Sequence, residues 1–336
     1  MENEINYKHH IINISYSTMN SSKNLKSEAE AFDRRIEERI KAGFIPDIRR
    51  AVKCDYFYKS FLRDPYFMKL YLGNEINYLI SKINKFSHPN ASVLEIGCGP
   101  GYVSLETARA GYHVTGIDVS QKAIDVARKT LASNPFKEGF GSLRFEVSSF
   151  EDFEGIFDVV LIRGAIHHMS EPEIVIKKIV SHLKPSGILV CTEPSRERWR
   201  KQDAAQVALI RGLLSLTGNW YEESLGDKLL EPNKFEEYID DVHIEYFEQR
   251  DKNEAGGQSP NDNSSNGFEI LKALRENLSE LEYKDGISFV YRMLGGIRGP
   301  DDTAHKLGEF LAMYDKTCVD ARYMEPNSFF FIGKKS

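Results

Sequence analysis

The sequence has few of the residues that build disulfide frameworks and metal sites. Its 336 residues include four cysteines, which lie far apart without a Cys-x-x-Cys pair or a histidine at ligand spacing. A disulfide scaffold and a zinc site are therefore not expected, and the composition is consistent with a reducing compartment. The sequence predicts no metal site.

Long apolar runs are missing as well. A membrane-spanning helix needs about 20 apolar residues, and the best candidate, residues 204–216, is shorter and contains Arg211. The N-terminus carries Glu2, Glu4 and Lys8 and has no apolar core of the length found in signal peptides. The prediction is a cytoplasmic protein that does not associate with membranes.

There is no excess of positive charge. The formal net charge is −6, so no overall field favours nucleic acid as a partner. The densest basic cluster, residues 196–201, is interrupted by Glu197 and is interpreted as the solvated start of a helix. With 41% hydrophobic and 28% charged residues, the chain is typical of a globular protein with a substantial core.

The most informative segment that is present covers residues 93–101, Val-Leu-Glu-Ile-Gly-Cys-Gly-Pro-Gly. An apolar run ends in three alternating glycines, and a helix-compatible stretch follows. This order predicts a strand, a tight turn and a helix, which bring bare backbone and a helix N-terminus close to a ligand. Residues 112–118 predict a second strand that ends in Asp118, placed to accept hydrogen bonds from ribose hydroxyls. Capping of the next helix is the alternative role for Asp118.

These motifs resemble those of the class I S-adenosylmethionine-dependent methyltransferases, over about residues 92–192. Residues 95–101 are similar to the first motif of that family, and Asp118 to its ribose-binding acid. Residues 144–150 are similar to the third strand and the turn beside adenine, 157–162 to the fourth strand, and 183–190 to the turn into the fifth. A dehydrogenase is the main rival for the first part, but such enzymes usually carry Gly-x-Gly-x-x-Gly.

The resemblance implies S-adenosylmethionine as the methyl donor and S-adenosylhomocysteine as the product. The three glycines would let the backbone approach the methionine part of the donor. The alternative for Phe150 is a position in the core, and the alternative for Arg163 is a salt bridge to a carboxylate of the lid. The residues expected to bind the cofactor are Glu95, Gly97, Cys98, Gly99, Gly101, Asp118, Val119, Ser149, Phe150 and Arg163.

The catalytic candidates are His167 and His168, which follow the fourth predicted strand. Members of the resembling family commonly carry one or two histidines there, and an imidazole titrates near neutrality, so a general base is chemically available. The alternative is that the pair caps or packs the next helix. Tyr58, Trp220 and Tyr221 are candidates for the substrate wall, although aromatic runs more often form core.

The predicted fold is α/β, a Rossmann-like doubly wound, mostly parallel sheet of seven strands. Strands are expected near residues 92–96, 113–117, 143–147, 157–162, 187–193, 242–247 and 328–332. The expected division is a helical N-terminal extension (1–85), the donor-binding core (86–195), a helical insertion (196–240), and a last part (241–336) with the final strands, helices and a flexible loop (251–267). The extension and the insertions are expected to form a lid, with extra packing or a dimer surface as alternatives.

The predicted function is methyl transfer to an oxygen or nitrogen of a small-molecule acceptor, a metabolite or a natural product. Neither Asn-Pro-Pro-Tyr nor Asp-Pro-Pro-Tyr follows the fourth strand, which argues against methylation of nucleobase amines. A protein or RNA methyltransferase is the first alternative, and a non-catalytic donor-binding module the second. The predicted partner is the small-molecule acceptor, and a homodimer is left open.

Overall fold

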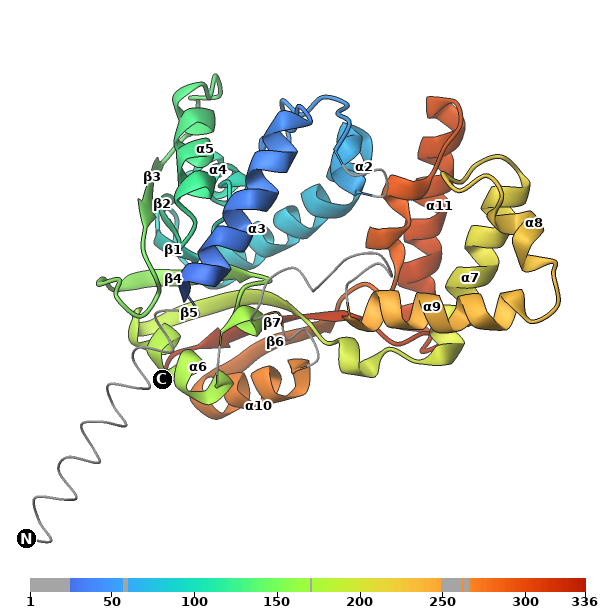
Figure 1. Ribbon diagram of the computed structural model, residues 1–336. Coiled ribbons are helices and arrows are strands. Elements are labelled where there is room, and N and C mark those ends of the chain that lie inside the picture. The colour runs from blue at the N-terminus through green and yellow to red at the C-terminus, as the bar shows by residue number, and fades with distance from the viewer. Residues whose placement is uncertain (1–24, 57–59, 170, 249–261, 263–265) are drawn as a thin grey trace, which may run out of the picture.

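The centre of the molecule is one seven-stranded sheet. A computed structural model describes residues 25–56, 60–169, 171–248, 262 and 266–336. The strands are β1 (Ser92–Ile96), β2 (His113–Asp118), β3 (Ser142–Val147), β4 (Phe157–Arg163), β5 (Leu183–Pro194), β6 (Ser279–Asp285) and β7 (Ser328–Lys334). Their order is β3-β2-β1-β4-β5-β7-β6 (Figure 1). The first five are parallel and β7 is antiparallel to both neighbours. The predicted α/β fold is confirmed.

Helices cover both faces of this sheet. Val93 of β1 packs into the core under α3 (Asn74–Phe86) and α4 (Tyr102–Arg109). Leu94 packs on the opposite side with α6 (Pro172–Ser181) and α10 (Gly267–Asn277), because successive side chains of a strand point to opposite faces. The helix α5 (Gln121–Ala132) packs on β2 and β3. The central strands are therefore buried on both faces, as parallel strands in α/β proteins are.

Two helical segments precede the sheet. A helix of residues 25–41, dark blue in Figure 1, comes first. The second runs from α2 (Pro65–Met68) through a π-helical turn (Lys69–Gly73) into α3. Asp64 caps its start by accepting a hydrogen bond from the backbone of Tyr66, and proline occupies the first helical position. Both segments reach the carboxyl edge of the sheet, where the candidate site lies.

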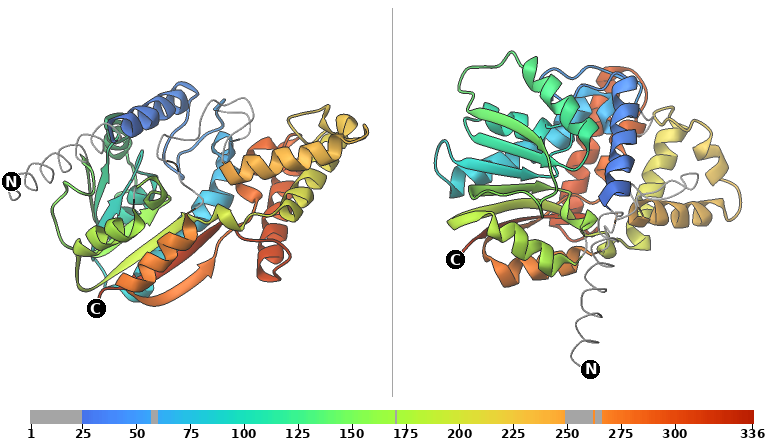
Figure 2. Two further views of the ribbon diagram at one scale, coloured as in Figure 1. Left: turned by 60° about the horizontal axis from the view of Figure 1, so that its bottom comes forward. Right: turned by 60° about the vertical axis from the view of Figure 1, so that its left-hand side comes forward.

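A block of inserted helices lies to one side of the sheet (Figures 1 and 2). It consists of α7 (Lys201–Leu216), α8 (Leu225–Leu229), α9 (Lys234–Glu248) and α11 (Asp301–Asp320). These helices enclose a separate apolar cluster that includes Trp199, Trp220 and Phe289. A buried ion pair between Arg211 and Glu245, 2.7 Å long, joins α7 to α9. Within the described part of the chain, no helix has the length and apolarity to cross a bilayer.

The strand predicted for residues 242–247 is wrong. These residues belong to α9, and the strand next to β7 is Ser279–Asp285, which was expected to be helical. Ile239, Val242 and Tyr246 are spaced by three and four residues and enter the inserted-helix cluster, so the helical period outweighs the short local alternation. The strand β6 pairs only with β7, and its charged residues suit an edge strand. Most of the loop predicted at 251–267 lies outside the described residues.

Candidate active site

The glycine-rich turn after β1 has the backbone that its sequence predicts. Gly97, Gly99 and Gly101 have φ of +70°, +52° and +84°, a region that other residues rarely adopt. An added Cβ at Gly97 would lie 2.6 Å from Ala165, and one at Gly101 would lie 2.5 Å from the ring of Phe145. A Cβ at Gly99 would meet nothing within 4 Å. Packing therefore requires the outer two glycines, whereas Gly99 opens onto the cavity beside the turn.

Asp118 connects this turn to the end of β2. Its carboxylate accepts hydrogen bonds from the backbone N–H of Gly99 and of Ser120, each 2.8 Å long. Burial raises the pKa of the Asp118 carboxyl, while the two backbone hydrogen bonds act in the opposite direction. Ser120 caps α5 with its hydroxyl, so the predicted capping role belongs to Ser120. Each carboxylate oxygen of Asp118 has a second lone pair for a ligand hydroxyl.

A cavity of about 820 Å³ lies at the carboxyl edge of the sheet. It is bounded by the glycine turn, the loops after β4 and β5, and the helix of residues 25–41. The predicted site residues that line it are Gly97, Gly99, Asp118, Val119, Ser149, Phe150, Arg163, His167 and His168. The topology thus brings together residues from four separate loops, because all parallel strands end at this edge.

Three predicted cofactor residues lie behind the turn instead of on the cavity wall. Glu95 is buried and accepts a hydrogen bond from the hydroxyl of Ser104 on α4. Burial raises the pKa of the Glu95 carboxyl to about 8. Cys98 packs in a small apolar cluster with α5, and Gly101 makes the close approach to Phe145. These residues shape the turn from behind, and their predicted role in cofactor binding stays a prediction.

Two of the three residues predicted for the substrate wall lie away from the cavity. Trp220 is 1% exposed and packs in the inserted-helix cluster, where Tyr221 also contacts it. Neither residue lines the cavity. The physical reason is that the inserted helices need a core of their own, and large aromatic side chains supply most of it. Tyr58 lies outside the described residues.

Glu193 organises the histidine loop after β4. Its carboxylate accepts hydrogen bonds from the backbone N–H of Ala165, Ile166 and His167, at 2.9, 2.9 and 3.3 Å. It also accepts one from Nδ1 of His167, at 2.8 Å. Burial lowers the pKa of His167, and the neighbouring His168 acts in the same direction while Glu193 opposes it. The imidazole of His167 is therefore held in a fixed orientation with its proton on Nδ1.

The helix of residues 25–41 closes over this loop. Glu28 lies 3.0 Å from Nδ1 of His168, and the ring of Phe32 packs edge-on against the same imidazole at 5.3 Å. Asp33 accepts hydrogen bonds from the hydroxyl of Ser120 and the backbone of Lys122. The helix thus contacts both the loop after β4 and the loop after β2, across the mouth of the site.

Arg163, at the end of β4, pairs with a carboxylate of the N-terminal helices. Its guanidinium donates to Glu75 of α3, with Nε 2.7 Å from the carboxylate oxygen. Burial is the largest single effect and lowers the pKa of Arg163, but Glu75 together with Tyr102 and Tyr71 outweighs it, so the pKa is raised. Of the alternatives for this residue, the structure therefore contains the salt bridge, and the paired guanidinium still faces the cavity.

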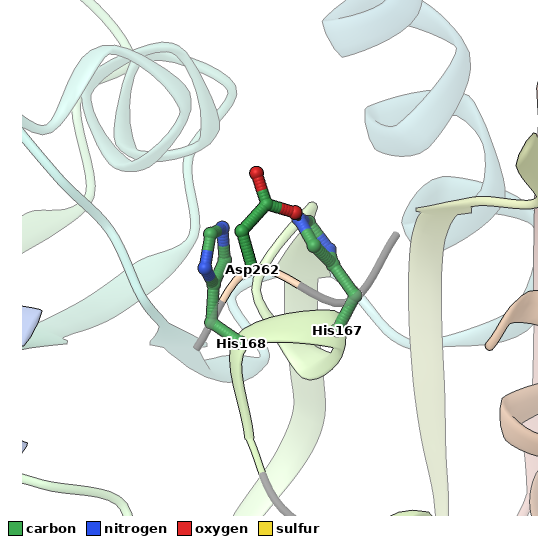
Figure 3. Close-up of side chains that lie close together, drawn as sticks. All are labelled: His167, His168 and Asp262. Carbon is green, nitrogen blue, oxygen red and sulfur yellow. The ribbon is translucent and has the colours of Figure 1, made fainter. Parts of the chain in front are cut away.

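Sequence reasoning missed several residues of the site. Glu193 ends an apolar strand just as Asp118 does, so its position at a strand tip was a usable signal. Glu28 and Glu75 lie on helices with many charged residues, where nothing in the pattern marks one carboxylate as special. Asp262 approaches the histidine pair from the segment before α10 (Figure 3). Only the tertiary structure brings these side chains to Arg163 and the two histidines.

Comparison with known proteins identifies the kind of domain that contains this site. The family model described as "Methyltransferase domain" matches residues 87–237, which hold the glycine turn, Asp118 and the histidine loop. The chain carries a class I S-adenosylmethionine-dependent methyltransferase domain. Such a domain binds S-adenosylmethionine, whose sulfonium carries an already activated methyl group, and releases S-adenosylhomocysteine.

Relatives of this methyltransferase match about half of its chain. The ubiquinone biosynthesis O-methyltransferase of Rickettsia akari is 28% identical over 180 residues, which cover 52% of this chain and 67% of that protein. The mitochondrial ubiquinone biosynthesis O-methyltransferase of Saccharomyces cerevisiae is 32% identical over 117 residues, 34% of this chain and 37% of that protein. A crystal structure of a methyltransferase from Methanosarcina mazei covers 76% of this chain and 96% of its own, with 18% identity and a TM-score of 0.45.

The described residues of the methyltransferase fit the donor. The positive-φ Gly99 leaves open space where a side chain would stand, so a ligand can approach the backbone. The half-buried Asp118 presents acceptor oxygens at the end of β2. The helix α4 begins directly after the turn at Gly101 and points its N-terminus toward the same space.

Proposed function

We propose that this methyltransferase transfers a methyl group to an oxygen or nitrogen of a small metabolite or natural product. The cavity carries the proposal: it extends from the donor residues past the histidine loop to Tyr291 and Arg292 at the inserted helices. Its volume of about 820 Å³ is in the range of small-molecule sites, about 300–1,000 Å³. Relatives named as ubiquinone biosynthesis O-methyltransferases support an organic acceptor.

In this proposal Asp118 binds the ribose of the donor, and the backbone around Gly97 and Gly99 contacts its methionine part. Ser149 and Phe150 lie beside the adenine. The acceptor lies on the side of His167 and His168, in line with the methyl group. Alignment of the two reactants lowers the barrier by several kcal/mol, up to about 7–11 kcal/mol for well-oriented groups. The proton-accepting role of His167 stays a prediction.

A macromolecular acceptor is the second candidate, and the position of the helix of residues 25–41 argues against it. A protein or RNA substrate needs an open groove, whereas the helix of residues 25–41 is held across the mouth by Glu28 and Asp33. We propose that this helix and the inserted helices act as the lid expected from the sequence. The cytoplasmic location and a homodimer stay predictions.

Labelled methyl transfer separates the two candidates. The full chain is incubated with S-adenosylmethionine that carries a labelled methyl group, together with a cell extract divided into a small-molecule filtrate and a macromolecular fraction. We expect label in compounds of the filtrate, and none with the Asp118→Asn variant as a blank. Label confined to the macromolecular fraction, and removed from it by protease or ribonuclease, would contradict the proposal.

A further inference from the structure

Three metal-ligating side chains meet beside the donor site. His167 and His168 follow β4, and Asp262 approaches from the segment before α10, with its carboxylate between the two imidazole rings in Figure 3. One ligand atom of each side chain lies within 4.8 Å of those of the other two. We propose that His167, His168 and Asp262 bind a divalent transition-metal ion.

Each histidine is oriented by a carboxylate on one side of its ring. Nδ1 of His167 lies 2.8 Å from Glu193, and Nδ1 of His168 lies 3.0 Å from Glu28. A carboxylate accepts hydrogen bonds, so Nδ1 of each ring carries the proton and Nε2 carries the lone pair that a metal ligand needs. Histidines that bind metals are held in this way, with the second nitrogen donating to a carboxylate or carbonyl.

The separation between His167 and Asp262 suits an ion better than a hydrogen bond. Nε2 of His167 is 3.9 Å from a carboxylate oxygen of Asp262, and the two side chains are 7% and 4% exposed. A ring lone pair and a buried carboxylate do not attract each other, whereas a cation between them binds both. Zn²⁺ and similar ions bind nitrogen and oxygen ligands at about 2.0–2.2 Å. The three ligand atoms lie within 4.8 Å of one another, so they need to move closer together by about 1 Å when the ion binds.

The chain just after Asp262 is anchored next to the histidines. The backbone N–H of Phe268 donates to Glu197 at 2.6 Å, in the segment that follows β5. A Cβ at Gly267 would lie 2.6 Å from the carbonyl oxygen of Pro194, so the two backbones touch. The helix α10, which begins there, packs against α6 and against the turn that carries the histidines. These contacts hold the start of α10 beside the histidine turn independently of the ion.

The donor set indicates both the ion and its use. Two imidazoles and one carboxylate favour Zn²⁺, Co²⁺ or Fe²⁺ over Mg²⁺ and Ca²⁺, which prefer all-oxygen ligands. Three protein ligands leave coordination positions open, as in catalytic metal sites. His167 and His168 line the cavity, so an oxygen of the acceptor is placed to fill one. The binding of an acceptor oxygen to the ion rests on the proposed function, and it narrows the class of methyl acceptor to compounds that carry a hydroxyl group. The same nitrogen of His167 cannot then accept the acceptor's proton.

Cobalt titration of the donor-free full chain tests the site. The protein is stripped with a chelator, and Co²⁺ binding is followed by calorimetry and by visible absorption. We expect one tight equivalent, weakened at least tenfold in Asp262→Asn. The sequence contains a second adjacent histidine pair, His9 and His10, so the double variant H9A/H10A is the matched control and is expected to bind as the wild type does.

Equal Co²⁺ affinity of the wild type and Asp262→Asn would overturn the proposal, and so would loss of the tight equivalent in H9A/H10A. Unchanged S-adenosylhomocysteine affinity shows that Asp262→Asn is folded. If that variant does not fold, X-ray absorption at the cobalt edge of the wild-type complex decides: two imidazole ligands are expected, and none would overturn the site. A chain that binds Co²⁺ but no S-adenosylhomocysteine would refute the donor site alone.

Discussion

Among single residues, Gly99 separates a functional glycine from a structural one. Gly97 and Gly101 cannot carry a Cβ because Ala165 and Phe145 stand in its way. Gly99 has open space around it, and so does Gly139 in the loop before β3, with φ of +67°. Both positions therefore have a left-handed backbone conformation that favours glycine, but of the two only Gly99 lines the cavity.

We expect Gly99→Ala and Gly139→Ala to lower the free energy of unfolding by similar amounts, about 1–2 kcal/mol, because both force alanine into the left-handed region. Only Gly99→Ala should weaken S-adenosylhomocysteine binding, by tenfold or more in calorimetry, since its methyl group occupies the space next to the donor. Equal donor affinity in the two variants would show that the donor does not contact the turn.

Glu95 makes the stability of the donor-free protein depend on pH. Burial raises the pKa of its carboxyl from 4.5 to about 8. Between these values the folded state keeps a proton that the unfolded state has lost, so stability falls as the pH rises through this window. The lowered pKa of His167 has the opposite effect on stability below its ordinary value of 6.5. Between 6.5 and 8 Glu95 is the main buried group expected to act, and the exposed His88, whose pKa is also raised, acts in the same direction.

We expect the free energy of unfolding to fall by about 1–2 kcal/mol between pH 6.5 and 8. Chemical denaturation at both pH values measures it. Glu95→Gln, which imitates the protonated carboxyl and can still bond to Ser104, should remove most of the dependence. A variant with the same slope as the wild type would assign the effect to other groups.

At the scale of elements, the helix of residues 25–41 is predicted to hold the donor in place. Its contacts with the site are Glu28 and Phe32 on His168. An edge-on aromatic contact is worth about 0.5–1.5 kcal/mol. Loss of this contact shifts the helix toward an open position, which lowers the population competent to bind.

Phe32→Ala should therefore weaken S-adenosylhomocysteine binding about fivefold, the equivalent of about 1 kcal/mol. Arg34→Ala, an exposed residue of the same helix, should leave the affinity unchanged. Both are measured by calorimetry at one ionic strength. If the affinity of Phe32→Ala equals that of the wild type, the helix is packing and not a lid.

Within the inserted block, one carboxylate ties α11 to the segment of residues 288–290. Asp315 is buried and accepts hydrogen bonds from the backbone N–H of Ser288, Phe289 and Val290, at 2.9, 2.7 and 2.7 Å. Phe289 belongs to the cluster of the inserted helices. Removal of the carboxylate leaves three buried donors without their acceptor.

Asp315→Ala should lower the free energy of unfolding by about 3 kcal/mol, since each unsatisfied buried group costs about 1–3 kcal/mol. Asp302→Ala near the start of the same helix, with a side chain 96% exposed, should change it by no more than about 0.5 kcal/mol. Urea denaturation measures both. A loss below about 1 kcal/mol in Asp315→Ala would mean that water replaces the carboxylate.

For the whole molecule, the cavity joins parts that have separate cores. Its lining comes from the N-terminal helices, the sheet and the segment of Ile287 and Tyr291. The sequence contains two tryptophans, and Trp199 and Trp220 both lie in the inserted-helix cluster. Tryptophan fluorescence therefore reports on the inserted helices, whereas far-ultraviolet circular dichroism reports on the whole chain.

We expect S-adenosylhomocysteine at one hundred times its Kd to stabilise the protein by about 2.7 kcal/mol. The thermal midpoints from fluorescence and circular dichroism should rise together, because we expect the sheet and the inserted helices to unfold as one unit. The Asp118→Asn variant should show neither rise. A shift in circular dichroism without one in fluorescence would mean that the inserted helices unfold on their own.

The sequence by itself determined the fold class and the donor, and nine of the residues that it proposed for the site line the cavity. One short stretch contains the glycines, the apolar strands and Asp118. Their spacing in the sequence is therefore enough to predict how they are arranged in the fold. The histidine pair was found for the same reason. The strand predicted at residues 242–247 failed because a short alternation cannot outweigh a helical period that is satisfied only by packing partners elsewhere.

The tertiary structure alone decided what closes the site and what could be bound there. Glu28, Glu193 and Asp262 come from segments far apart in the chain and meet around the two histidines. It also moved Trp220 from the expected substrate wall into the core of the inserted helices. Contacts between distant segments depend on how whole helices pack against the sheet, and local spacing in the sequence carries no record of that packing.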